Sequence, residues 1–533
     1  MPVIDGSMQS FALTLDKFLE HAAKWNPHAE VVTARERGRV DRIGYAELHR
    51  RSRSVSGVLA AFDVHAGDHV ATLAWNTQAH VEVWYAIMGM GAVCHTLNPR
   101  LTCAQLAAMV VQSQARVLIV SADLESLARN IAAAAPSIER LVLIDVPADA
   151  PAATSGVPVV CALEPLITQA HGDVPWGKFD ETSPCGLCFT SGTTGAPKGV
   201  TYTHRSSFLH TLRLLQTDVM AIAARDSILV AVPMFHANAW GLPFAAPAAG
   251  AKLVLPGRHT DGASLASLIN AEGVTVAVGI ATLWLELVDH LERTGGELPT
   301  LERIIVGGAP LPQSLMERIE KRLEVTVQTS WGMTELSPSG TTASRDAPVR
   351  AAHLSGRPAI GVDFLLTDVE GRPLPQQRGV EGHLRVRGAA VIERYFGDEN
   401  RATDADGWFS TGDLARIEPA GDLVITGRAK DMIKSGGEWI NPAEIEAIVS
   451  ALPEVALAAV IARPHLKWGE RPILIVETRA AASISDATLL AALWGKVASW
   501  WVPEEVIRVP RMPLSPTGKI DKVRLRMEYG GGA

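Results

Sequence analysis

The chain has 533 residues, of which 47% are hydrophobic and 20% are charged, and its formal net charge is −8 at pH 7. One compact core rarely holds so long a chain, so we expect two or more domains in an ordinary soluble globular protein. The negative charge argues against nucleic acid as the main partner, because a surface that follows phosphates is basic.

The N-terminal stretch, MPVIDGSMQSFALTLDKFLEHAAKW, carries Asp5, Asp16 and Glu20 and lacks a long apolar run, so it does not resemble a signal peptide. The chain has no stretch of about 18 uninterrupted apolar residues, which predicts no membrane-spanning segment. Its five cysteines are too sparse for a disulfide framework, so we expect a reducing, cytoplasmic location.

Short β-branched runs alternate with helical patterns over the first 360 residues. Apolar residues recur at three- and four-residue spacing between several of these runs, as in residues 265–269. This alternation predicts an α/β fold with largely parallel sheets covered by helices. The predicted strands are residues 69–73, 116–120, 141–144, 228–232, 252–255, 274–278 and 304–306.

From about Gly361 the pattern changes to short strands between glycine turns, as in GVDFLLTD, GHLRVRG and GDLVITG. This predicts a small, mostly antiparallel subdomain at the end of the large domain. Further on, a small α+β domain is predicted from helices and strands of its own. These elements are helices over 442–450 and 486–499 and strands over 456–461 and 473–476. We therefore divide the chain into residues 1–427, a boundary at 428–431 and residues 432–533.

The stretch FTSGTTGAPKGV, residues 189–200, packs three glycines, four hydroxyl side chains and Lys198 into twelve residues. Glycine lets the backbone approach a phosphate closely, and backbone N–H groups can enclose it. The stretch differs from the common P-loop because Lys198 follows a proline and no Ser or Thr comes next to hold magnesium. From the loop alone, phosphate binding and a surface loop without a ligand both remain open.

Cys185 and Cys188 form a CxxC motif directly before this loop. A zinc site needs a second such pair or nearby histidines, and the neighbouring sequence offers neither. A redox pair is the other alternative. The stretch CGLCFTSG is better explained as an apolar strand that leads into the loop.

Four further stretches carry residues that suit nucleotide chemistry. SWGMTE, residues 330–335, ends in a hydroxyl and a carboxylate. STGDLA, residues 410–415, places Asp413 in a glycine turn, where its carboxylate can accept two ribose hydroxyls. TGRAKDMIKSGGEWINPAEIE, residues 426–446, supplies several cations ahead of a helix, and LSPTGKIDK, residues 514–522, places Lys519 in a glycine turn. Each of these stretches alone has an ordinary explanation, such as a solvated lysine. Their occurrence together and in this order is a much more specific signal.

With these motifs in this order, the chain resembles the adenylate-forming superfamily, which contains acyl-CoA synthetases, peptide-synthetase adenylation domains and beetle luciferases. The resemblance covers essentially the whole chain, from the N-terminal helical region to Lys522. The stretches HTLNPRL, PMFHANAWGLPF and LKWGERP are similar to the fatty-acyl-CoA synthetase branch. The resemblance to this branch implies an enzyme that uses ATP, Mg²⁺ and CoA. In such enzymes a carboxylate attacks the α-phosphorus of ATP and releases pyrophosphate, and a thiol then displaces AMP from the acyl-adenylate.

The resemblance also implies how the nucleotide is held. Thr334 would contact the α-phosphate, Glu335 would bind Mg²⁺, and Asp413 would bind the ribose with help from Arg428. The β- and γ-phosphates would lie in the glycine-rich loop, at Thr190, Ser191, Gly192, Thr193, Thr194, Gly195 and Lys198. The adenine pocket would be lined by Gly308, Ala309, Pro310, Trp331 and Gly332. The family more often has tyrosine where Trp331 stands, so the ring would still stack on adenine but would offer no hydroxyl group.

Lys519 would be the main catalytic cation of adenylation, because a compact charge on a long stem can bridge the carboxylate and the α-phosphate. A surface lysine is the alternative. Lys430 stands at the family's hinge, about which the C-terminal domain rotates between the two half-reactions. The rotation would withdraw Lys519. It would bring the CoA-binding stretch to the adenylate, namely Lys434, Ser435, Gly436 and Gly437.

The identity of the carboxylic acid substrate is the least determined part of the predicted function. By resemblance, His236 lies near the acyl carboxylate, and Trp240 with Gly241 gates the acyl tunnel, although a core histidine and a simply packed tryptophan are the alternatives. Ala281 stands where the family commonly has proline, so the loop beside the acyl pocket can differ in shape. A medium-chain fatty acid is our first expectation. Longer chains, short thioether acids and arylalkanoates follow it.

Three classes of function remain to be compared. The first is a CoA ligase, with a homodimer expected because dimers occur in this branch. The second is an adenylation enzyme that loads a carrier protein. The third is a nucleotide-binding protein without catalysis, which would have no need of Lys519, Glu335 and Asp413 together. Release of AMP with CoA or with a carrier protein separates the first two.

Overall fold

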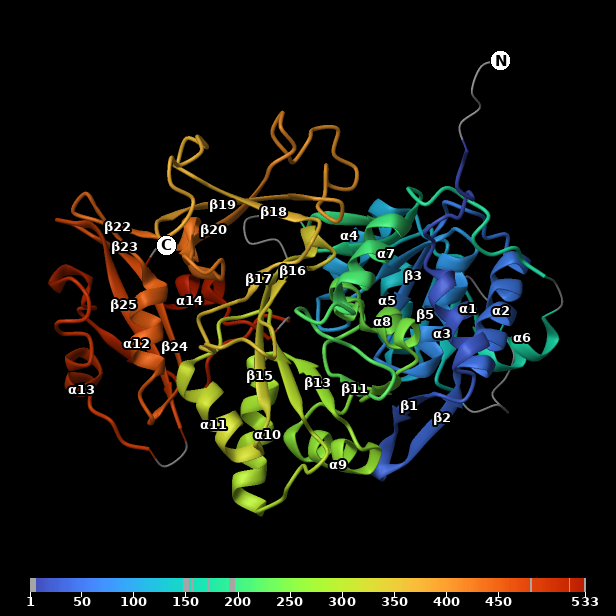
Figure 1. The fold of residues 1–533 in the computed structure, drawn as a ribbon, viewed down its shortest axis with the longest axis horizontal. Helices are drawn as coiled ribbons and strands as arrows, with labels where there is room; N and C mark the ends of the chain where they lie inside the picture. Colours follow the sequence, from blue (N-terminus) through green and yellow to red (C-terminus); the bar gives the residue numbers. More distant parts are fainter. Residues whose placement is uncertain are drawn as a thin grey trace.

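The structure is a computed structural model that describes residues 6–146, 153–154, 158–170, 173–190, 197–479, 482–516 and 518–531, with the backbone alone at 153–154. Figure 1 shows a broad body formed by the first two thirds of the chain, with the C-terminal unit in red at one side. Within the described residues the strands form four sheets. The predicted fold class, parallel-rich sheets with an antiparallel subdomain and a small C-terminal unit, is confirmed.

The first large sheet is parallel except for its two outermost pairs, β10 with β9 and β7 with β8. Strands such as β5 are buried along their whole length, as expected when helices cover both faces. The hairpin of β9 and β10 encloses residues 191–196, which lie outside the described residues. In spatial order the sheet contains β10 (Gly199–Thr203), β9 (Pro184–Phe189), β4 (Val93–Thr96), β3 (His69–Leu73), β5 (Val117–Ser121), β6 (Arg140–Ile144), β8 (Val159–Ala162) and β7 (Ala153–Thr154).

The second large sheet has a parallel centre from β15 to β1 and antiparallel strands at both ends. The chain reverses after β15, so residues 333–338 lie at the carboxyl edge of the sheet. In α/β proteins this edge is where ligands bind. In spatial order the sheet contains β17 (Arg357–Pro358), β16 (Ser339–Thr342), β15 (Thr326–Gly332), β14 (Arg303–Val306), β13 (Val276–Gly279), β11 (Ser227–Val230), β12 (Lys252–Leu255), β1 (Glu30–Ala34) and β2 (Val40–Gly44).

A shared core joins the two large sheets, and α3 and α8 contribute to it. Trp84 of α3 is fully buried and stacks on Phe244 of α8, with 5.9 Å between ring centroids. The two polar side chains buried on α3 have partners, since Glu82 accepts a hydrogen bond of 2.6 Å from Arg51 and His80 lies 3.0 Å from the Thr72 hydroxyl, so α3 can be buried along its length. The helices of this part are α1 (Asp16–Trp25), α2 (Tyr45–Ala61), α3 (Gln78–Gly89), α4 (Cys103–Ser113), α5 (Glu125–Ala134), α6 (Leu163–Gln169), α7 (His204–Leu214), α8 (Leu242–Ala249), α9 (Gly262–Glu272), α10 (Ala281–Thr294) and α11 (Gln313–Leu323).

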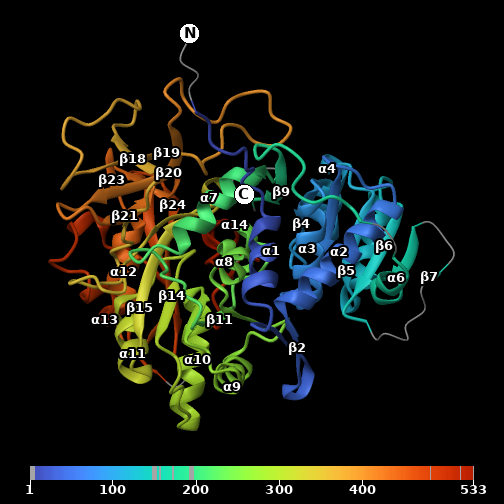
Figure 2. The same ribbon diagram turned by 45° about the vertical axis from the view of Figure 1, so that its right-hand side comes forward.

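A four-stranded antiparallel sheet follows, and the C-terminal unit comes after it with clusters of buried side chains of its own. The two units are connected through the short 3-10 helix Ala429–Asp431. Figure 2 shows the antiparallel sheet above the helices α12 and α13 of the C-terminal unit. The sheet contains β18 (Val362–Thr367), β19 (Glu381–Gly388), β20 (Phe409–Ile417) and β21 (Leu423–Arg428). The C-terminal unit contains β22 (Ile433–Ser435), β23 (Glu438–Ile440), α12 (Pro442–Ser450), β24 (Val455–His465), β25 (Gly469–Thr478), α13 (Asp486–Ala491), β26 (Val506–Arg508) and α14 (Lys522–Tyr529).

All seven predicted strands of the first part are present, with ends that shift by at most a few residues. The predicted helix over 486–499 is wrong in length, because α13 ends at Ala491. The chain then turns through Gly495, whose φ is +74°, a value that glycine adopts without strain. The domain limits proposed at 428–431 stay a prediction.

Cys185 and Cys188 lie buried in β9, so the strand interpretation of the CxxC motif is confirmed. In the parts of the chain that the structure describes, no group of three or more His, Cys, Asp and Glu side chains could hold a metal. None of the helices in those parts is both long enough and apolar enough to span a membrane.

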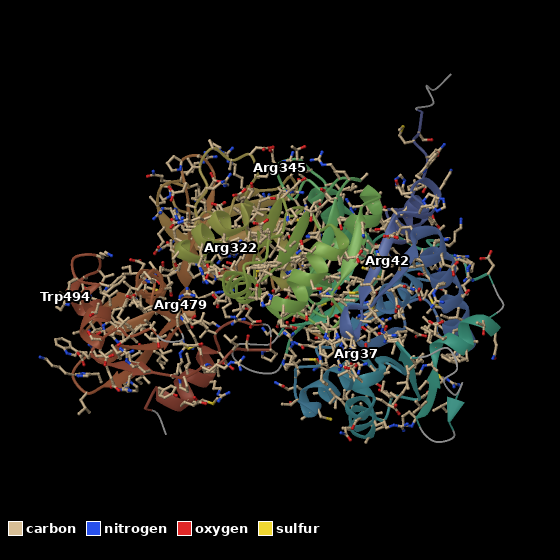
Figure 3. The ribbon with its side chains drawn as sticks, turned by 90° about the horizontal axis from the view of Figure 1, so that it is seen from below. Arg37, Arg42, Arg322, Arg345, Arg479 and Trp494 are labelled. Atoms are coloured by element: carbon tan, nitrogen blue, oxygen red, sulfur yellow. The ribbon has the colours of Figure 1, made fainter. Side chains whose placement is uncertain are left out.

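A buried carboxylate joins three elements at the edge of the second sheet. Glu272, at the end of α9, accepts hydrogen bonds of 2.6 and 2.7 Å from Arg42 of β2 and one of 2.8 Å from Lys252 of β12. Arg42 is labelled in Figure 3. Burial by itself would raise the pKa of Glu272, but the hydrogen bonds from Arg42 and Lys252 outweigh it and lower the pKa.

We expect Glu272→Gln to lower the free energy of unfolding at pH 7 by about 1–3 kcal/mol, because two cations lose their charged acceptor. The folded-state pKa is depressed, so this stabilisation is lost as the pH falls through that pKa, and the variant and wild type then converge. Urea unfolding at several pH values measures this difference. Glu30→Gln, which removes an exposed partner 3.3 Å from Arg42, is the control and should change little. An equal effect of both substitutions would contradict the role of Glu272.

Candidate active site

The mouth of the glycine-rich loop is well defined. Thr190 donates a backbone hydrogen bond to Lys198 O at 2.9 Å, which holds the two ends of the loop together. The Lys198 ammonium lies over the ring of Tyr395, 4.7 Å from its centroid. Five predicted phosphate contacts fall outside the described residues, namely Ser191, Gly192, Thr193, Thr194 and Gly195.

Thr334 and Glu335 begin a 3-10 turn, Thr334–Leu336, at the carboxyl edge of the second sheet. Tyr202 of β10 donates a hydrogen bond of 2.8 Å to the carbonyl oxygen of Thr334, which ties this turn to the phosphate-loop hairpin. The Tyr395 hydroxyl donates one of 2.9 Å to Glu335 Oε1. Burial, and then the charge of Glu335, raises the pKa of Tyr395, so Tyr395 stays a donor.

Glu335 is buried, and among the described residues its side chain has Tyr395 as its single hydrogen-bond partner. The described residues around it contain no further set of metal ligands. Mg²⁺ is commonly held by one or two carboxylates together with phosphates of the substrate and water. The donor set therefore fits a magnesium ion that arrives with a nucleotide, and it does not fit a cation held by protein alone.

Asp413 lies inside β20, so its predicted place in a glycine turn is wrong. Gly412, with φ +74°, disturbs the strand locally and leaves the neighbouring carboxylate accessible to partners from elsewhere. Trp331 Nε1 donates to Asp413 Oδ2 at 3.0 Å, and Arg428 Nε lies 2.8 Å from Oδ1. Burial raises the pKa of Asp413, while Arg428 and Trp331 oppose the rise.

The GGAP segment follows β14 and packs closely against its surroundings. A Cβ at Gly307 would lie 2.3 Å from Ser330 Oγ and 2.9 Å from the Trp240 ring. A Cβ at Gly332 would lie 2.2 Å from the carbonyl oxygen of Pro338. These glycines therefore let the backbone of the predicted adenine pocket approach β15 and Trp240, with Gly308 at φ +81° and Ala309 and Pro310 next in the chain.

His236 is half-buried, and burial followed by the charge of Lys519 lowers its pKa to about 4. The imidazole is therefore neutral at pH 7. Trp240 is buried and ends a run of four non-glycine residues, 237–240, whose φ values lie between +44° and +54°. Each left-handed residue of this kind costs about 1–2 kcal/mol, so tight packing must hold the run in place. Gly241 follows with φ +79°.

Lys519 reaches this site from the C-terminal unit. Its carbonyl oxygen accepts a hydrogen bond of 2.6 Å from Ser515 N, which confirms the predicted turn. A Cβ at the neighbouring Gly518 would lie 2.4 Å from Ile280 Cδ1, so the turn is seated directly against the large domain. Lys519 remains exposed to solvent.

Lys519 interacts electrostatically with the other charged groups of the candidate site. Burial, followed by the charge of Arg428, lowers the pKa of Lys519, whereas Asp413 and Glu335 oppose this shift. Lys519 therefore lies close enough to His236, Glu335, Asp413 and Arg428 for their charges to interact, at the place where the C-terminal unit meets the large domain.

The predicted CoA-binding stretch is not gathered there. Gly436 and Gly437 form the turn between β22 and β23, and the Lys434 ammonium lies over Trp439, 5.5 Å from its centroid. Ser435 is held by Arg471 at 3.3 Å. Figure 1 shows this hairpin at the outer edge of the C-terminal unit, away from the large domain. Lys430 lies in the connecting 3-10 helix, where burial lowers its pKa.

Sequence reasoning missed three parts of the site. Tyr202 and Tyr395 lie in stretches without a recognisable motif, and the bond from Trp331 to Asp413 joins residues 82 positions apart. A single sequence carries no signal for such pairs, because only the fold brings them together.

The family model described as AMP-binding enzyme matches residues 19–396, and the one described as AMP-binding enzyme C-terminal domain matches residues 444–519. The chain is 39% identical to the 3-methylmercaptopropionyl-CoA ligase of Ruegeria lacuscaerulensis over 98% of each chain. It is 40% identical to the medium-chain-fatty-acid–CoA ligase of Ectopseudomonas oleovorans over 98% of this chain and 97% of that one. Among solved structures, ATP-bound MatB from Rhodopseudomonas palustris has a TM-score of 0.84 at 27% identity and covers 97% of this chain and 99% of its own.

The proximity of Lys519 to His236 can be measured in solution. We expect Lys519→Met to raise the pKa of His236 from about 4, because a neighbouring positive charge is removed, while burial keeps it below 6.5. NMR titration of isotope-labelled histidine rings gives this value. The control is Lys522→Met, which removes a lysine that pairs instead with Glu446 at 2.7 Å. An unchanged His236 pKa in Lys519→Met would contradict the described position of Lys519.

Proposed function

The chain belongs to the AMP-binding enzyme family, and from this premise we propose that it is an ATP-dependent ligase that joins a carboxylic acid to coenzyme A. The supporting observation is the position of Lys519, which a separate C-terminal unit places near Glu335, Asp413 and His236. A nucleotide-binding protein without catalysis would not need a cation delivered in this way.

The chemical difficulty of the first half-reaction is that one anion must attack another. Lys519 neutralises the carboxylate and the α-phosphate as they approach, and Thr334 orients that phosphate. His236, neutral at pH 7, borders the acid without adding a competing charge. Positioning and electrostatic stabilisation therefore supply most of the reduction of the barrier. Mg²⁺, bound through Glu335, would neutralise charge on the phosphates.

The remaining polar groups bind the nucleotide. Asp413 accepts hydrogen bonds from the ribose hydroxyls, and the bonds from Trp331 and Arg428 fix the orientation of its carboxylate. Lys198 contributes to the β- and γ-phosphate site, together with the loop from Thr190 to Gly195. The adenine lies against Trp331 beside the backbone of Gly308, Ala309, Pro310 and Gly332.

The second half-reaction needs a different arrangement. The C-terminal unit rotates about Lys430, withdraws Lys519, and brings Lys434, Ser435, Gly436 and Gly437 beside the incoming CoA. Separate clusters of buried side chains in the two units make such a rotation feasible, because few apolar contacts must be broken. Polar contacts across the boundary include Arg479 with Asp289 at 3.9 Å and Ser314 with the Ser450 carbonyl at 3.4 Å. Arg479 is labelled in Figure 3 on the side that faces the large domain.

For the acid, we propose a chain of medium length as the first choice. One relative is named a medium-chain-fatty-acid–CoA ligase, and apolar residues follow Trp240 and Gly241 in the sequence. Longer chains, short thioether acids and arylalkanoates are the alternatives. A carrier protein in place of CoA is the alternative acceptor. We further infer a cytoplasmic location from the five unpaired cysteines, and a homodimer stays a prediction.

We expect Lys519→Ala to lower pyrophosphate release from ATP and the acid by about 100-fold or more, because the charge at the reacting centre is removed. A coupled pyrophosphate assay over a panel of acids measures the rate. Lys522→Ala on the same C-terminal segment is the control and should retain the activity. A rate near wild type in Lys519→Ala would remove Lys519 from the mechanism.

Lys430→Pro tests the rotation separately. Proline fixes φ and restricts the residue before it, so the hinge can no longer absorb the change of backbone angles. We expect thioester formation from preformed acyl-adenylate to fall more than pyrophosphate release does. Single-turnover measurements of each half-reaction give the two rates. Equal losses in both would contradict a hinge at this position.

A further inference from the structure

The short segment 390–396 connects two parts of the site that are far apart in the sequence. Near its start, Ile392 N donates a hydrogen bond of 3.0 Å to the carbonyl oxygen of Glu335. At its end, Phe396 N donates one of 2.8 Å to Gly199 O in β10. The segment is therefore fixed both to the turn that carries Glu335 and to the phosphate-loop hairpin.

Tyr395 lies in this segment, and two parts of its side chain contact groups of opposite charge. Its hydroxyl donates a hydrogen bond of 2.9 Å to Glu335 Oε1, and the Lys198 ammonium lies over its ring, 4.7 Å from the centroid. Glu335 is 8% exposed, whereas Lys198 is exposed on the hairpin. One aromatic side chain thus contacts both the cation of the phosphate loop and the carboxylate of the turn.

The two charges do not pair with each other. Neither Lys198 nor Glu335 forms an ion pair with any described residue. An ammonium and a carboxylate that contact the same side chain attract each other, and burial of one of them reduces the screening by water. An ion pair between Lys198 and Glu335 would occupy a cation and a carboxylate that the nucleotide needs. Tyr395 gives each of them a neutral partner instead, so both charges stay available to a ligand.

The hydrogen bond from Tyr395 also fixes the direction of the Glu335 carboxylate. Oε1 accepts this bond, and Oε2 has no hydrogen-bond partner among the described residues, so Oε2 is left for a metal ion. Carboxylates that bind metal ions are themselves usually hydrogen-bonded, and loss of such an outer partner typically costs about 10- to 100-fold in metal affinity.

We propose that Tyr395 is a positioning residue that orients Glu335 for Mg²⁺ and keeps Lys198 from pairing with Glu335, so that the metal ion and the phosphates find separate partners. This inference rests on the proposed function, because it takes ATP with Mg²⁺ as the ligand. The hydroxyl acts on the metal ion through Glu335, and the ring acts on the phosphates through Lys198. The two parts of the side chain can therefore be tested separately.

Tyr395→Phe keeps the ring and removes the hydroxyl. Calorimetry on the full chain, without any acid, measures binding of an ATP analogue in which a methylene group replaces the oxygen between the α- and β-phosphorus atoms. The dissociation constant is determined once with saturating Mg²⁺ and once with EDTA. We expect Tyr395→Phe to reduce the gain in affinity that Mg²⁺ provides by about 10-fold, because Glu335 loses its outer partner. The dissociation constant in EDTA should stay nearly unchanged.

Tyr395→Leu removes the ring as well. Lys198 is then free to pair with Glu335, so we expect the affinity in EDTA to fall too, by about 2- to 5-fold, as for the loss of an exposed ion pair. AMP lacks the β- and γ-phosphates, so it should bind both variants as it binds the wild type.

Tyr202→Phe is the matched control. Its hydroxyl donates a hydrogen bond of 2.8 Å to the same turn, but to the carbonyl oxygen of Thr334 and not to the carboxylate. This variant should change both dissociation constants alike and leave the gain from Mg²⁺ as in the wild type. When Glu335 is already replaced by Gln, Tyr395→Phe should not change that gain further, because the hydroxyl acts through the carboxylate.

An unchanged gain from Mg²⁺ in Tyr395→Phe would overturn the proposal. Equal losses of affinity with Mg²⁺ and with EDTA would also overturn it, because Tyr395 would then only support the fold. If the wild type binds no nucleotide under either condition, the proposed function fails together with this inference. Nucleotide binding without pyrophosphate release for any acid would refute the proposed function alone.

Discussion

The candidate site depends on the positive charge of Lys519, which the C-terminal unit places beside residues of the large domain. Lys519 sits on a turn of the C-terminal unit, yet its surroundings are Asp413, Glu335 and Arg428, which all precede that unit in the sequence. Two carboxylates favour its charge, while burial and Arg428 oppose it. Within the described part of the chain Lys519 forms no ion pair, because Asp413 pairs with Arg428 instead. The Lys519 ammonium is therefore available to contact a ligand.

The rest of the fold presents the partners of this lysine. The parallel centre of the second sheet ends at one edge, where β15 passes into the turn of Thr334 and Glu335. The antiparallel sheet contributes Asp413 and Arg428 on adjacent strands, paired in register. Trp331 links the two sheets through its indole nitrogen. Tyr202 of the phosphate-loop hairpin donates a hydrogen bond to the same turn, and Tyr395 contacts both Glu335 of the turn and the Lys198 ammonium.

Much of this organisation could be predicted from the sequence, because local patterns determine it. The strands 69–73 and 252–255 and the helix 442–450 have the predicted ends, since alternating apolar residues and flanking turns are local signals. The predicted helix over 486–499 is too long, because α13 ends at Ala491 and the chain then turns at Gly495, whose left-handed conformation the apolar pattern does not reveal. Asp413 was misplaced for a related reason, since Gly412 marks an irregularity within a strand rather than a turn. The pairing of Trp331 with Asp413 is a property of the folded chain, so residue types alone could not reveal it.

The left-handed run at residues 237–240 has a thermodynamic consequence. Its four residues carry side chains, so the conformation costs the resting protein several kcal/mol, at about 1–2 kcal/mol for each residue. A ligand that allowed this segment to relax would recover that energy as affinity. The affinity of such a ligand would therefore exceed what its own contacts with the protein provide.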